Sequence, residues 1–483
     1  MEQTERSWPA VAEALYLPAF RGKPAVWLTI AENGVRRYEF QIALPERGEC
    51  PQFWAKIPLC GAVRMVGASD EFYDAVCTEP AAVSAEPERP ALHFTTNSGW
   101  INDPNGLIFV DGVWHAYYQY NPLSTSWANM SWGHATSPDL LHWTKQEPVL
   151  YPDEYGPAFS GSAIHMPDGG QAFFYTAAGG LTPWSTGRQY TQQWAVSTDG
   201  GRTLQKRGTA LPAIEPENRD PKVFYHAESG AYIMVLWLTA HDFAILRSTD
   251  LTEWMLSQRL TLPGGYECPD LFRLTDPSGS DACWVFWSAD GTWYAGEFDG
   301  FRFDWDGVVH HAYATRHAYA AQTFSGTDRV ISMPWIRFAN NGRCFTGAFG
   351  LPRTLGLSRR NGMRVITQQP VREWDEIRRD SVPVRGTTEL PAVTWELTVQ
   401  RQPGEKLTVQ LGNWRLTWAD DVLTADGESF SVSGNDLRMI RDGFLLELFA
   451  DGGAWYSPMD LTGVPNNAIT VTGAQSAMLC AVE

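Results

Sequence analysis

Five segments of the chain resemble one another, and three of them carry an acidic residue at a matching place. The segments read NDPNGLIF from Asn102, FSGSAIHM from Phe159, RDPKVFYH from Arg219, ECPDLFRL from Glu267 and AAQTFSG from Ala320. Their acidic side chains are Asp103, Asp220 and Glu267. Two carboxyl groups can together hydrolyse a glycosidic bond, because one attacks or stabilises the anomeric carbon while the other protonates the leaving oxygen. We therefore take these three residues as the candidate catalytic residues.

The neighbours of each acid favour a division of roles. Asp103 lies near Asn102 and Asn105, and amide groups that donate hydrogen bonds keep a carboxylate ionised. Arg219 precedes Asp220 and should keep that carboxylate ionised too, which suits contact with sugar hydroxyls better than proton transfer. Glu267 is flanked by tyrosine, cysteine and proline, a drier setting in which a carboxyl group stays protonated. The expected nucleophile is Asp103, and the expected acid/base is Glu267.

Aromatic and amide side chains lie near the same segments. A sugar ring can pack its C–H face on an aromatic ring, and its hydroxyl groups need planar polar partners. The candidates for ring contact are Trp100, Trp127, Trp132, Phe159 and Trp335, and those for hydroxyl contact are Asn102, Gln119, Asn129, Ser160 and Arg219. Each tryptophan could equally pack in a core. His134 is interpreted as a structural histidine rather than a base or ligand.

A repeat of about 50 residues explains the likeness of the five segments. The motif SPDLLHW (137–143) returns as STDLTEW (248–254), with weaker copies STDGG (197–201) and FDGF (298–301). Their aspartates are 60, 51 and 49 residues apart, and an aromatic run typical of a β-strand precedes each copy. Five units of about four strands predict a five-bladed β-propeller. The alternative is a β-sandwich with accidental similarity.

The predicted propeller also places the site. The first strand of each blade lines the central channel of a propeller, so equivalent positions from different blades converge on one pocket. Asp103, Asp220 and Glu267 occupy such positions. A single Asp-Pro pair could be only a turn, but three acids at equivalent positions indicate a shared pocket.

Taken in order, the motifs resemble glycoside hydrolase family 32, which includes invertases, inulinases and levanases. The matching stretches are SGWINDPNGL (98–107), WANMSWGHATSPDLLHW (127–143), FSGSA (159–163), RDPKV (219–223), ECPDL (267–271) and YAAQTF (319–324). The resemblance implies a five-bladed propeller followed by a β-sandwich, and a retaining mechanism through a covalent fructosyl-enzyme. It implies that Asp103 is the nucleophile, Asp220 the transition-state stabiliser and Glu267 the acid/base. The positions matching the family's fructose pocket are Asn102, Gln119, Trp127, Ser160 and Arg219, and neither a metal nor a cofactor is implied.

The chain departs from the family pattern around its fifth segment. The family usually has an acidic residue shortly before its YAAQTF-like motif, whereas this chain has His317 and Ala318 there. The following stretch, 331–355, also diverges. Both departures are expected near the pocket rim, so they bear on substrate preference more than on the chemistry.

Two further parts of the chain flank the repeat. The predicted domains are an N-terminal β-sandwich-like module (1–88), the catalytic propeller (89–370), a linker (371–381) and a C-terminal β-sandwich (382–483). The first module alternates like strands and ends in the stretch AVSAEPERP. We expect it to pack against the propeller, with shaping of the cleft or carbohydrate binding as alternatives. The last domain is expected to support the propeller and to allow a homodimer.

Composition opposes several other classes of protein. A net charge of −18 disfavours nucleic acid and anionic membranes as partners, and no apolar run is long enough for a membrane-spanning helix. Seven cysteines without a CxxC pair predict reduced, mostly buried thiols rather than a metal site. The first residues do not resemble a signal peptide. We therefore expect a cytosolic protein if Met1 is the native start, and an extracellular or cell-surface protein if a leader was removed.

Three other functions compete with fructoside hydrolysis. A propeller glycosidase acting on arabinose-containing glycans also uses three carboxylates, but the WINDPNG and ECPDL motifs favour a fructosidase. A fructosyltransferase would run the same chemistry with a sugar acceptor in place of water. A non-catalytic sugar-binding module is opposed by the presence of all three acids. The expected substrates are sucrose, fructo-oligosaccharides, inulin or levan, attacked from the chain end because a propeller pocket is usually closed at one end.

Overall fold

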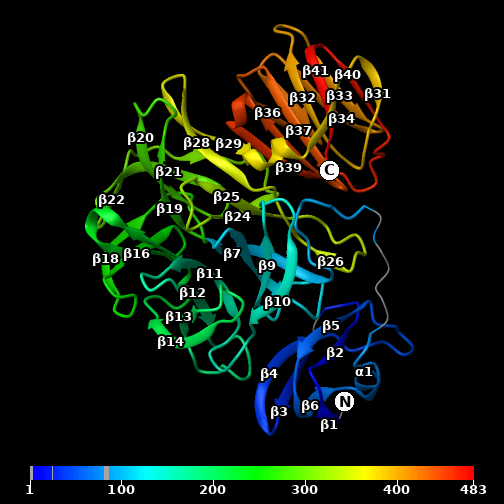
Figure 1. Cartoon of the computed structure of the whole chain (residues 1–483), viewed down its shortest axis with the longest axis vertical. Helices are drawn as coiled ribbons and strands as arrows, with labels where there is room; N and C mark the ends of the chain where they lie inside the picture. Colours follow the sequence, from blue (N-terminus) through cyan, green and yellow to red (C-terminus); the bar gives the residue numbers. More distant parts are fainter. Residues whose placement is uncertain (1–3, 24, 81–85, 87, 483) are drawn as a thin grey trace.

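The computed structural model describes residues 4–23, 25–80, 86 and 88–482, and almost all of its regular structure is β-strand. Figure 1 shows three parts in chain order: a small N-terminal module, a ring of sheets, and a C-terminal pair of sheets at the opposite end of the molecule from the first module. The ring has five sheets, as the repeat predicts, so the all-β fold class and the five-bladed propeller are confirmed.

Each blade is an antiparallel sheet whose strands follow one another in the sequence. Blade one has β7 (Gly99–Val110), β8 (Val113–Asn121), β9 (Ser131–Ser137) and β10 (Thr144–Leu150), and blade two has β11 (Ala158–His165), β12 (Gln171–Ala178), β13 (Tyr190–Ser197) and β14 (Gln205–Leu211). Blade three has β15 (Arg219–His226), β16 (Ala231–Thr239), β17 (Asp242–Ser248) and β18 (Met255–Thr261). Blade four has β19 (Asp270–Thr275), β20 (Ala282–Trp287), β21 (Thr292–Phe298), β22 (Phe303–Trp305) and the short β23 (His310–His311). Blade five has β24 (Ala318–Thr323), β25 (Ile331–Ile336), β27 (Ala348–Phe349), β28 (Arg353–Arg360) and β29 (Met363–Pro370).

The ring closes through a short parallel pairing. Strand β26 (Phe345–Thr346) leaves blade five and pairs with the start of β7 in blade one, with Phe345 opposite Gly99. A side chain at position 99 would meet the carbonyl oxygen of Asn121 at 2.4 Å, and the backbone φ there is +92°. Glycine is therefore required where the closing strand meets the first blade.

The repeated aspartates hold turns and take no part in the pocket. Asp139 accepts hydrogen bonds from the Ser137 hydroxyl and from two backbone N–H groups of the turn between β9 and β10. Asp199 and Asp250 do the same between the third and fourth strands of blades two and three. An aspartate that accepts backbone N–H groups ahead of it fixes a tight turn. The repeat is thus a mark of blade architecture.

A bulge near the start of four inner strands points their residues into the channel. The pairing register shifts between Ile101 and Pro104 in β7, Ala158 and Gly161 in β11, Arg219 and Lys222 in β15, and Tyr319 and Gln322 in β24. A β-bulge leaves extra residues unpaired and re-aims their side chains. Asp103, Ser160 and Asp220 are among these unpaired residues. In blade four Glu267 instead precedes the inner strand.

The N-terminal module is built from two small sheets. Strands β1 (Thr4–Val11), β6 (Gly61–Ala68), β3 (Val26–Glu32) and β4 (Val35–Ile42) form one sheet, β2 (Ala14–Ala19) and β5 (Phe53–Pro58) form the other, and helix α1 (Asp70–Asp74) follows. Alternate residues of β3 and β4 enter its core, among them Leu28, Ile30 and Phe40, as the alternation in the sequence predicts. Of the residues assigned to this module, 1–3, 24, 81–85 and 87 lie outside the described residues.

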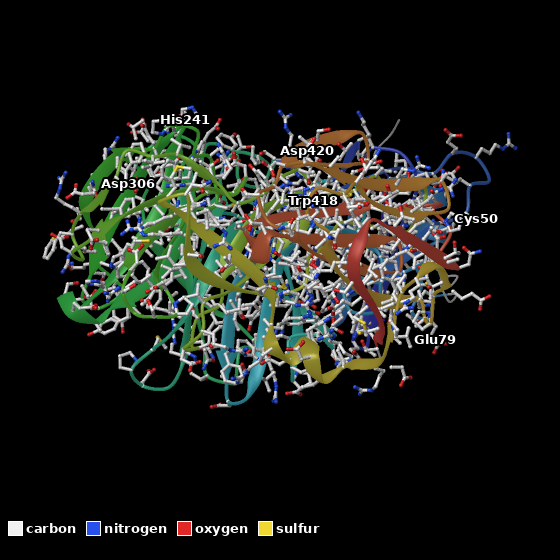
Figure 2. The ribbon with its side chains drawn as sticks, turned by 90° about the horizontal axis from the view of Figure 1, so that it is seen from above. Cys50, Glu79, His241, Asp306, Trp418 and Asp420 are labelled. Carbon is white, nitrogen blue, oxygen red and sulfur yellow. The ribbon has the colours of Figure 1, made fainter. Side chains whose placement is uncertain are left out.

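The C-terminal domain has two six-stranded sheets. One contains β30 (Arg378–Pro383), β41 (Ala474–Val482), β32 (Thr394–Arg401), β37 (Asp436–Asp442), β38 (Leu445–Ala450) and β39 (Trp455–Asp460). The other contains β31 (Gly386–Glu389), β40 (Ala468–Thr472), β33 (Leu407–Leu411), β34 (Trp414–Ala419), β35 (Val422–Ala425) and β36 (Glu428–Ser431). The fully buried Trp418, labelled in Figure 2, belongs to the core between the sheets. Strand β30 begins at Arg378, inside the stretch predicted as a linker, because it pairs with β41.

A buried ionic cluster fastens the start of the propeller to this domain. Asp442 accepts hydrogen bonds of 2.8 Å from the backbone N–H groups of Ala91, Leu92 and His93, and one of 2.9 Å from the His93 ring. The other ring nitrogen of His93 lies 3.5 Å from Glu447. These side chains are fully buried. A buried charge needs such partners to be tolerated.

Two other predictions can be compared with the structure. All seven cysteines are free thiols; four are buried, whereas Cys50, which Figure 2 labels, and Cys60 are exposed and Cys77 is half-buried. Within the described ranges, no helix has the length and apolar character needed to cross a membrane.

Candidate active site

The predicted carboxylates meet in one pocket at the centre of the propeller. Its volume is about 440 Å³, within the range of pockets that hold small molecules. The lining comprises Asn102, Asp103, Gln119, Trp127, Phe159, Ser160, Leu181, Tyr190, Glu217, Arg219, Asp220, Glu267, Tyr319 and Trp335. The structure brings together the three acids that the repeat placed at equivalent positions, because Asp103, Asp220 and Glu267 belong to the inner segments of three different blades.

Asp103 lies in the bulge of β7 and is held by two donors. The Ser160 hydroxyl donates a hydrogen bond of 2.6 Å to its Oδ2, and the Cys268 thiol lies 3.4 Å from the same oxygen. Burial raises the pKa of Asp103, while the Ser160 hydrogen bond acts against that rise. The oxygen that Ser160 contacts is therefore held in one place within the pocket.

Asp220 is the most buried of the three acids. Its side chain accepts a 3.2 Å hydrogen bond from the backbone N–H of Cys268, and its own N–H donates to the Thr176 hydroxyl at 3.0 Å. Its backbone φ of 65° is in the left-handed region, as are those of Glu267 and Cys268. Non-glycine residues in this region are uncommon and cluster at functional sites. Burial raises the pKa of Asp220 above its ordinary value.

Arg219 was predicted to keep Asp220 ionised, but its hydrogen bonds go to Glu267, and burial raises the pKa of Asp220 to about 7. The Nη2 of Arg219 donates a 2.5 Å hydrogen bond to Oε1 of Glu267, and its Nε donates a second of 3.2 Å, whereas the nearest Asp220 oxygen is 4.0 Å away. The guanidinium stacks 3.9 Å above the Trp237 ring, which directs it across the pocket. The other carboxyl oxygen of Glu267 accepts a 2.7 Å hydrogen bond from the Tyr319 hydroxyl.

Three carboxyl groups thus face one cavity in different settings. Cys268 joins two of them, since its thiol lies 3.4 Å from Asp103 and 3.5 Å from Asp220. Glu267 stands at the wetter side, contrary to the drier setting predicted from its neighbours, with 21% of its side chain exposed against 5% for Asp220. Glycoside hydrolysis requires a pair of carboxyl groups at one site, and these three residues can supply it. Among the described residues no cluster of potential metal ligands occurs.

The comparison with known proteins agrees with this geometry. The model of the glycosyl hydrolases family 32 N-terminal domain matches residues 93–370, which is more than half of the chain. The chain belongs to glycosyl hydrolase family 32. The family resemblance of the sequence motifs is thereby confirmed.

Several curated relatives of this family 32 chain are more than 30% identical to it. The invertase of Debaryomyces hansenii is 36% identical over 276 residues, which cover 51% of this chain and 52% of that protein. The levanase of Bacillus subtilis is 33% identical over 344 residues, 64% of this chain and 50% of that protein. The extracellular exo-inulinase of Aspergillus niger is 32% identical over 356 residues, 60% of this chain and 66% of that protein. The chain thus matches about half to two thirds of the length of these three relatives.

Solved structures share the fold of this family 32 chain. The fructofuranosidase of Schwanniomyces occidentalis in complex with fructose has a TM-score of 0.70 at 22% identity, covering 81% of this chain and 97% of that one. The exo-inulinase of Aspergillus awamori has a TM-score of 0.71 at 23% identity, covering 82% of this chain and 99% of that one.

Most of the residues that the sequence predicts to contact a sugar are found in the lining of this pocket. These are Asn102, Gln119, Trp127, Phe159, Ser160, Arg219 and Trp335. The Trp100 indole donates a 2.8 Å hydrogen bond to the side-chain oxygen of Asn102 and so orients that amide. Trp127 is 52% exposed, which leaves its ring free to meet a ligand at the rim.

Three candidates, Trp100, Asn129 and Trp132, are not part of the pocket lining. Asn129 does not line the pocket, because its amide oxygen and nitrogen bind the backbone N–H and carbonyl of Gln41 in the N-terminal module at 2.7 and 2.8 Å. Trp132 is fully buried, and its indole N–H donates to the carbonyl of Phe159. The Asn129 and Trp132 side chains therefore have structural roles. His134 is buried and hydrogen-bonded to His115 at 3.0 Å, as its structural interpretation expected.

Sequence reasoning missed four lining residues: Leu181, Tyr190, Glu217 and Tyr319. Tyr319 begins the YAAQTF motif, which was recognised without giving this side chain a role. Leu181 lies in the connection between β12 and β13, where no repeat marks it. Loops carry function without regular patterns, so their contribution to a pocket emerges only from the fold.

Proposed function

We propose that this protein hydrolyses β-fructofuranosides and releases fructose, with Asp103 as nucleophile and Glu267 as acid/base. The observation that carries the proposal is the convergence of Asp103, Asp220 and Glu267 from three blades on one 440 Å³ pocket. The names of the relatives support the substrate class, since they include an invertase, a levanase and exo-inulinases.

The proposed reaction has two steps. Asp103 attacks the anomeric carbon of the terminal fructosyl unit while Glu267 protonates the oxygen that leaves. Water then attacks the fructosyl-enzyme, and Glu267 takes its proton, which frees fructose and restores both acids. The hydrogen bond from Ser160 fixes the attacking carboxylate, and Arg219 with Tyr319 holds the Glu267 side chain where the leaving oxygen must lie.

Asp220 has a separate role in this scheme. Asp220 is 4% exposed and lines the pocket, and its carboxyl group shares the Cys268 thiol with Asp103. A buried acid at this place can hold the sugar's hydroxyl groups, and those hydrogen bonds strengthen as charge develops in the transition state. We propose that Asp220 stabilises the transition state and transfers no proton.

The decisive experiment is product analysis with sucrose, 1-kestose, inulin and levan. Free fructose as the sole early product from both polymers would support exo-hydrolysis and rank the linkages. Oligosaccharides released from the polymers would instead mean internal attack. Longer oligosaccharides formed from concentrated sucrose would mean transfer to a sugar acceptor, and no reaction with any of the four would refute the proposal. The homodimer expected from the sequence stays a prediction, which light scattering in solution checks.

A further inference from the structure

The β3–β4 hairpin of the N-terminal module turns one face toward the propeller. Trp27 pairs with Gln41 and Thr29 pairs with Glu39 across the two strands, while the alternate residues Leu28 and Ile30 enter the module's own core. Side chains alternate between the two faces of a sheet. Trp27, Gln41 and Glu39 therefore share the face that looks away from that core.

This face holds the two propeller connections that form part of the pocket rim. The β8–β9 connection carries Trp127 and is fixed by the paired hydrogen bonds from Asn129 to the Gln41 backbone. The β12–β13 connection carries Leu181 and is fixed by Glu39, whose carboxylate accepts a 2.7 Å hydrogen bond from the backbone N–H of Trp184. Glu39 is only 2% exposed, so this contact is shielded from water.

A second cavity lies between this face and those connections. Its volume is about 140 Å³, and it is lined by Trp27, Glu39, Gln41, Trp127, Ala128, Asn129, Met130, Pro152, Pro157, Leu181 and Thr182. Trp127 and Leu181 also line the active-site pocket, so the two cavities adjoin at the rim. A cavity of roughly 150 Å³ holds a benzene-sized ring, which makes the volume suitable for one sugar ring.

The chemistry of the lining fits a neutral carbohydrate. The charge of Glu39 is balanced by the guanidinium of Arg36, which also lies 4.8 Å above the Trp184 ring. Within the described part of the chain, no group hydrogen-bonds to the Gln41 side-chain amide. An indole face beside a planar amide that lacks a partner is a suitable surface for a sugar ring and its hydroxyl groups.

We propose that Trp27 and Gln41 form a distal subsite for the third sugar unit of a fructo-oligosaccharide or fructan. This inference rests on the proposed function. The 440 Å³ pocket is of a size that takes the first two units, and the chain beyond them leaves over the rim at Trp127 and Leu181 into the second cavity. The N-terminal module thereby sets a preference for chains longer than a disaccharide.

The test compares kcat/KM for the tetrasaccharide nystose with kcat/KM for sucrose in three variants of the full-length protein. Trp27→Ala is expected to lower the nystose-to-sucrose ratio about tenfold, mainly through KM for nystose, the upper range for one lost aromatic contact. Gln41→Ala is expected to lower it about threefold. Trp54→Ala is the matched control, because this half-buried tryptophan of the same module lines a different cavity and should leave the ratio unchanged.

The outcomes separate the two proposals. If the wild type releases fructose but neither Trp27→Ala nor Gln41→Ala changes the ratio, the subsite is refuted while the proposed function stands. An equal fall in Trp54→Ala would also refute it, because that result indicates a general disturbance of the module. If Trp27→Ala unfolds, Gln41→Ala decides, since its side chain makes no hydrogen bond that folding requires. A wild type inactive on both sugars overturns the function and the subsite together.

Discussion

The buried cluster of His93, Asp442 and Glu447 should make the protein less stable as the pH rises into the alkaline range. Burial lowers the pKa of the His93 ring, but its hydrogen bonds to Asp442 and Glu447 outweigh burial and raise that pKa from 6.5 to about 9. A group whose pKa is higher in the folded state than in the unfolded chain stabilises the fold only while it is protonated. The contribution is therefore complete below pH 6.5 and is lost as the pH rises through 9.

The size of this effect follows from the shift. A rise from 6.5 to about 9 corresponds to ~3 kcal/mol. His93→Gln removes the titrating group, so the free energy of unfolding of the wild type minus that of the variant should shrink by about that amount between pH 6.5 and 9.5. Urea unfolding at several pH values measures it, with tryptophan fluorescence as the signal. A difference that stays constant over this range, or grows with pH, would refute the reasoning.

Four further predictions concern the site and its support. Asp103→Asn and Glu267→Gln should each lower kcat at least ~10³-fold without loss of folding, measured as fructose release beside a thermal melt; near-normal turnover would remove the residue from the mechanism. Tyr319→Phe removes a hydrogen bond to the Glu267 carboxylate and should lower kcat/KM about 10- to 100-fold, whereas an unchanged value would show that Arg219 alone positions this acid. Glu39→Ala leaves the partly buried N–H of Trp184 without its acceptor and should destabilise the protein by about 1 kcal/mol in urea unfolding, with Glu39→Gln as the milder control. Asn129→Ala removes two hydrogen bonds to the Gln41 backbone and should lower the melting temperature by a few degrees, and equal melts would mean that apolar contacts alone hold the module.

The sequence was most informative where the fold repeats. The turn aspartates at 139, 199, 250 and 299 recur because four blades share the same kind of turn, and the inner segments are alike because four of the five inner strands carry a bulge. Equivalence between blades then placed three acids in one pocket without any long-range information. This works in a propeller because residues at equivalent positions of the repeat lie at similar distances from the central channel.

Long-range partners were not predictable from neighbours in the chain. Arg219 was assigned to the adjacent Asp220, but the Trp237 ring beneath its guanidinium directs it to Glu267. Asn129 lies within a pocket motif, yet its amide is used by a β-strand 88 residues earlier. Local sequence gives the type of a side chain, whereas packing between elements decides which of several polar groups it meets.

The 140 Å³ cavity beside the pocket was likewise not predictable from neighbours in the chain. Three of its residues, Trp27, Glu39 and Gln41, come from the N-terminal module, and the connection that carries Leu181 has no repeat. The alternation of strands β3 and β4 predicted which residues avoid the module's core. It could not predict that this face meets the propeller.

The pairing of β26 with β7 has a consequence for how the chain can be made. Gly99 and Phe345 form this seam, so the ring stays open during synthesis until nearly 250 further residues have left the ribosome. Until then the start of β7, at Gly99 and Trp100, lacks its partner strand, and unpaired strand edges recruit other chains. A nascent or truncated product ending before Phe345 should therefore aggregate, and chaperone demand should peak just before the seam is completed.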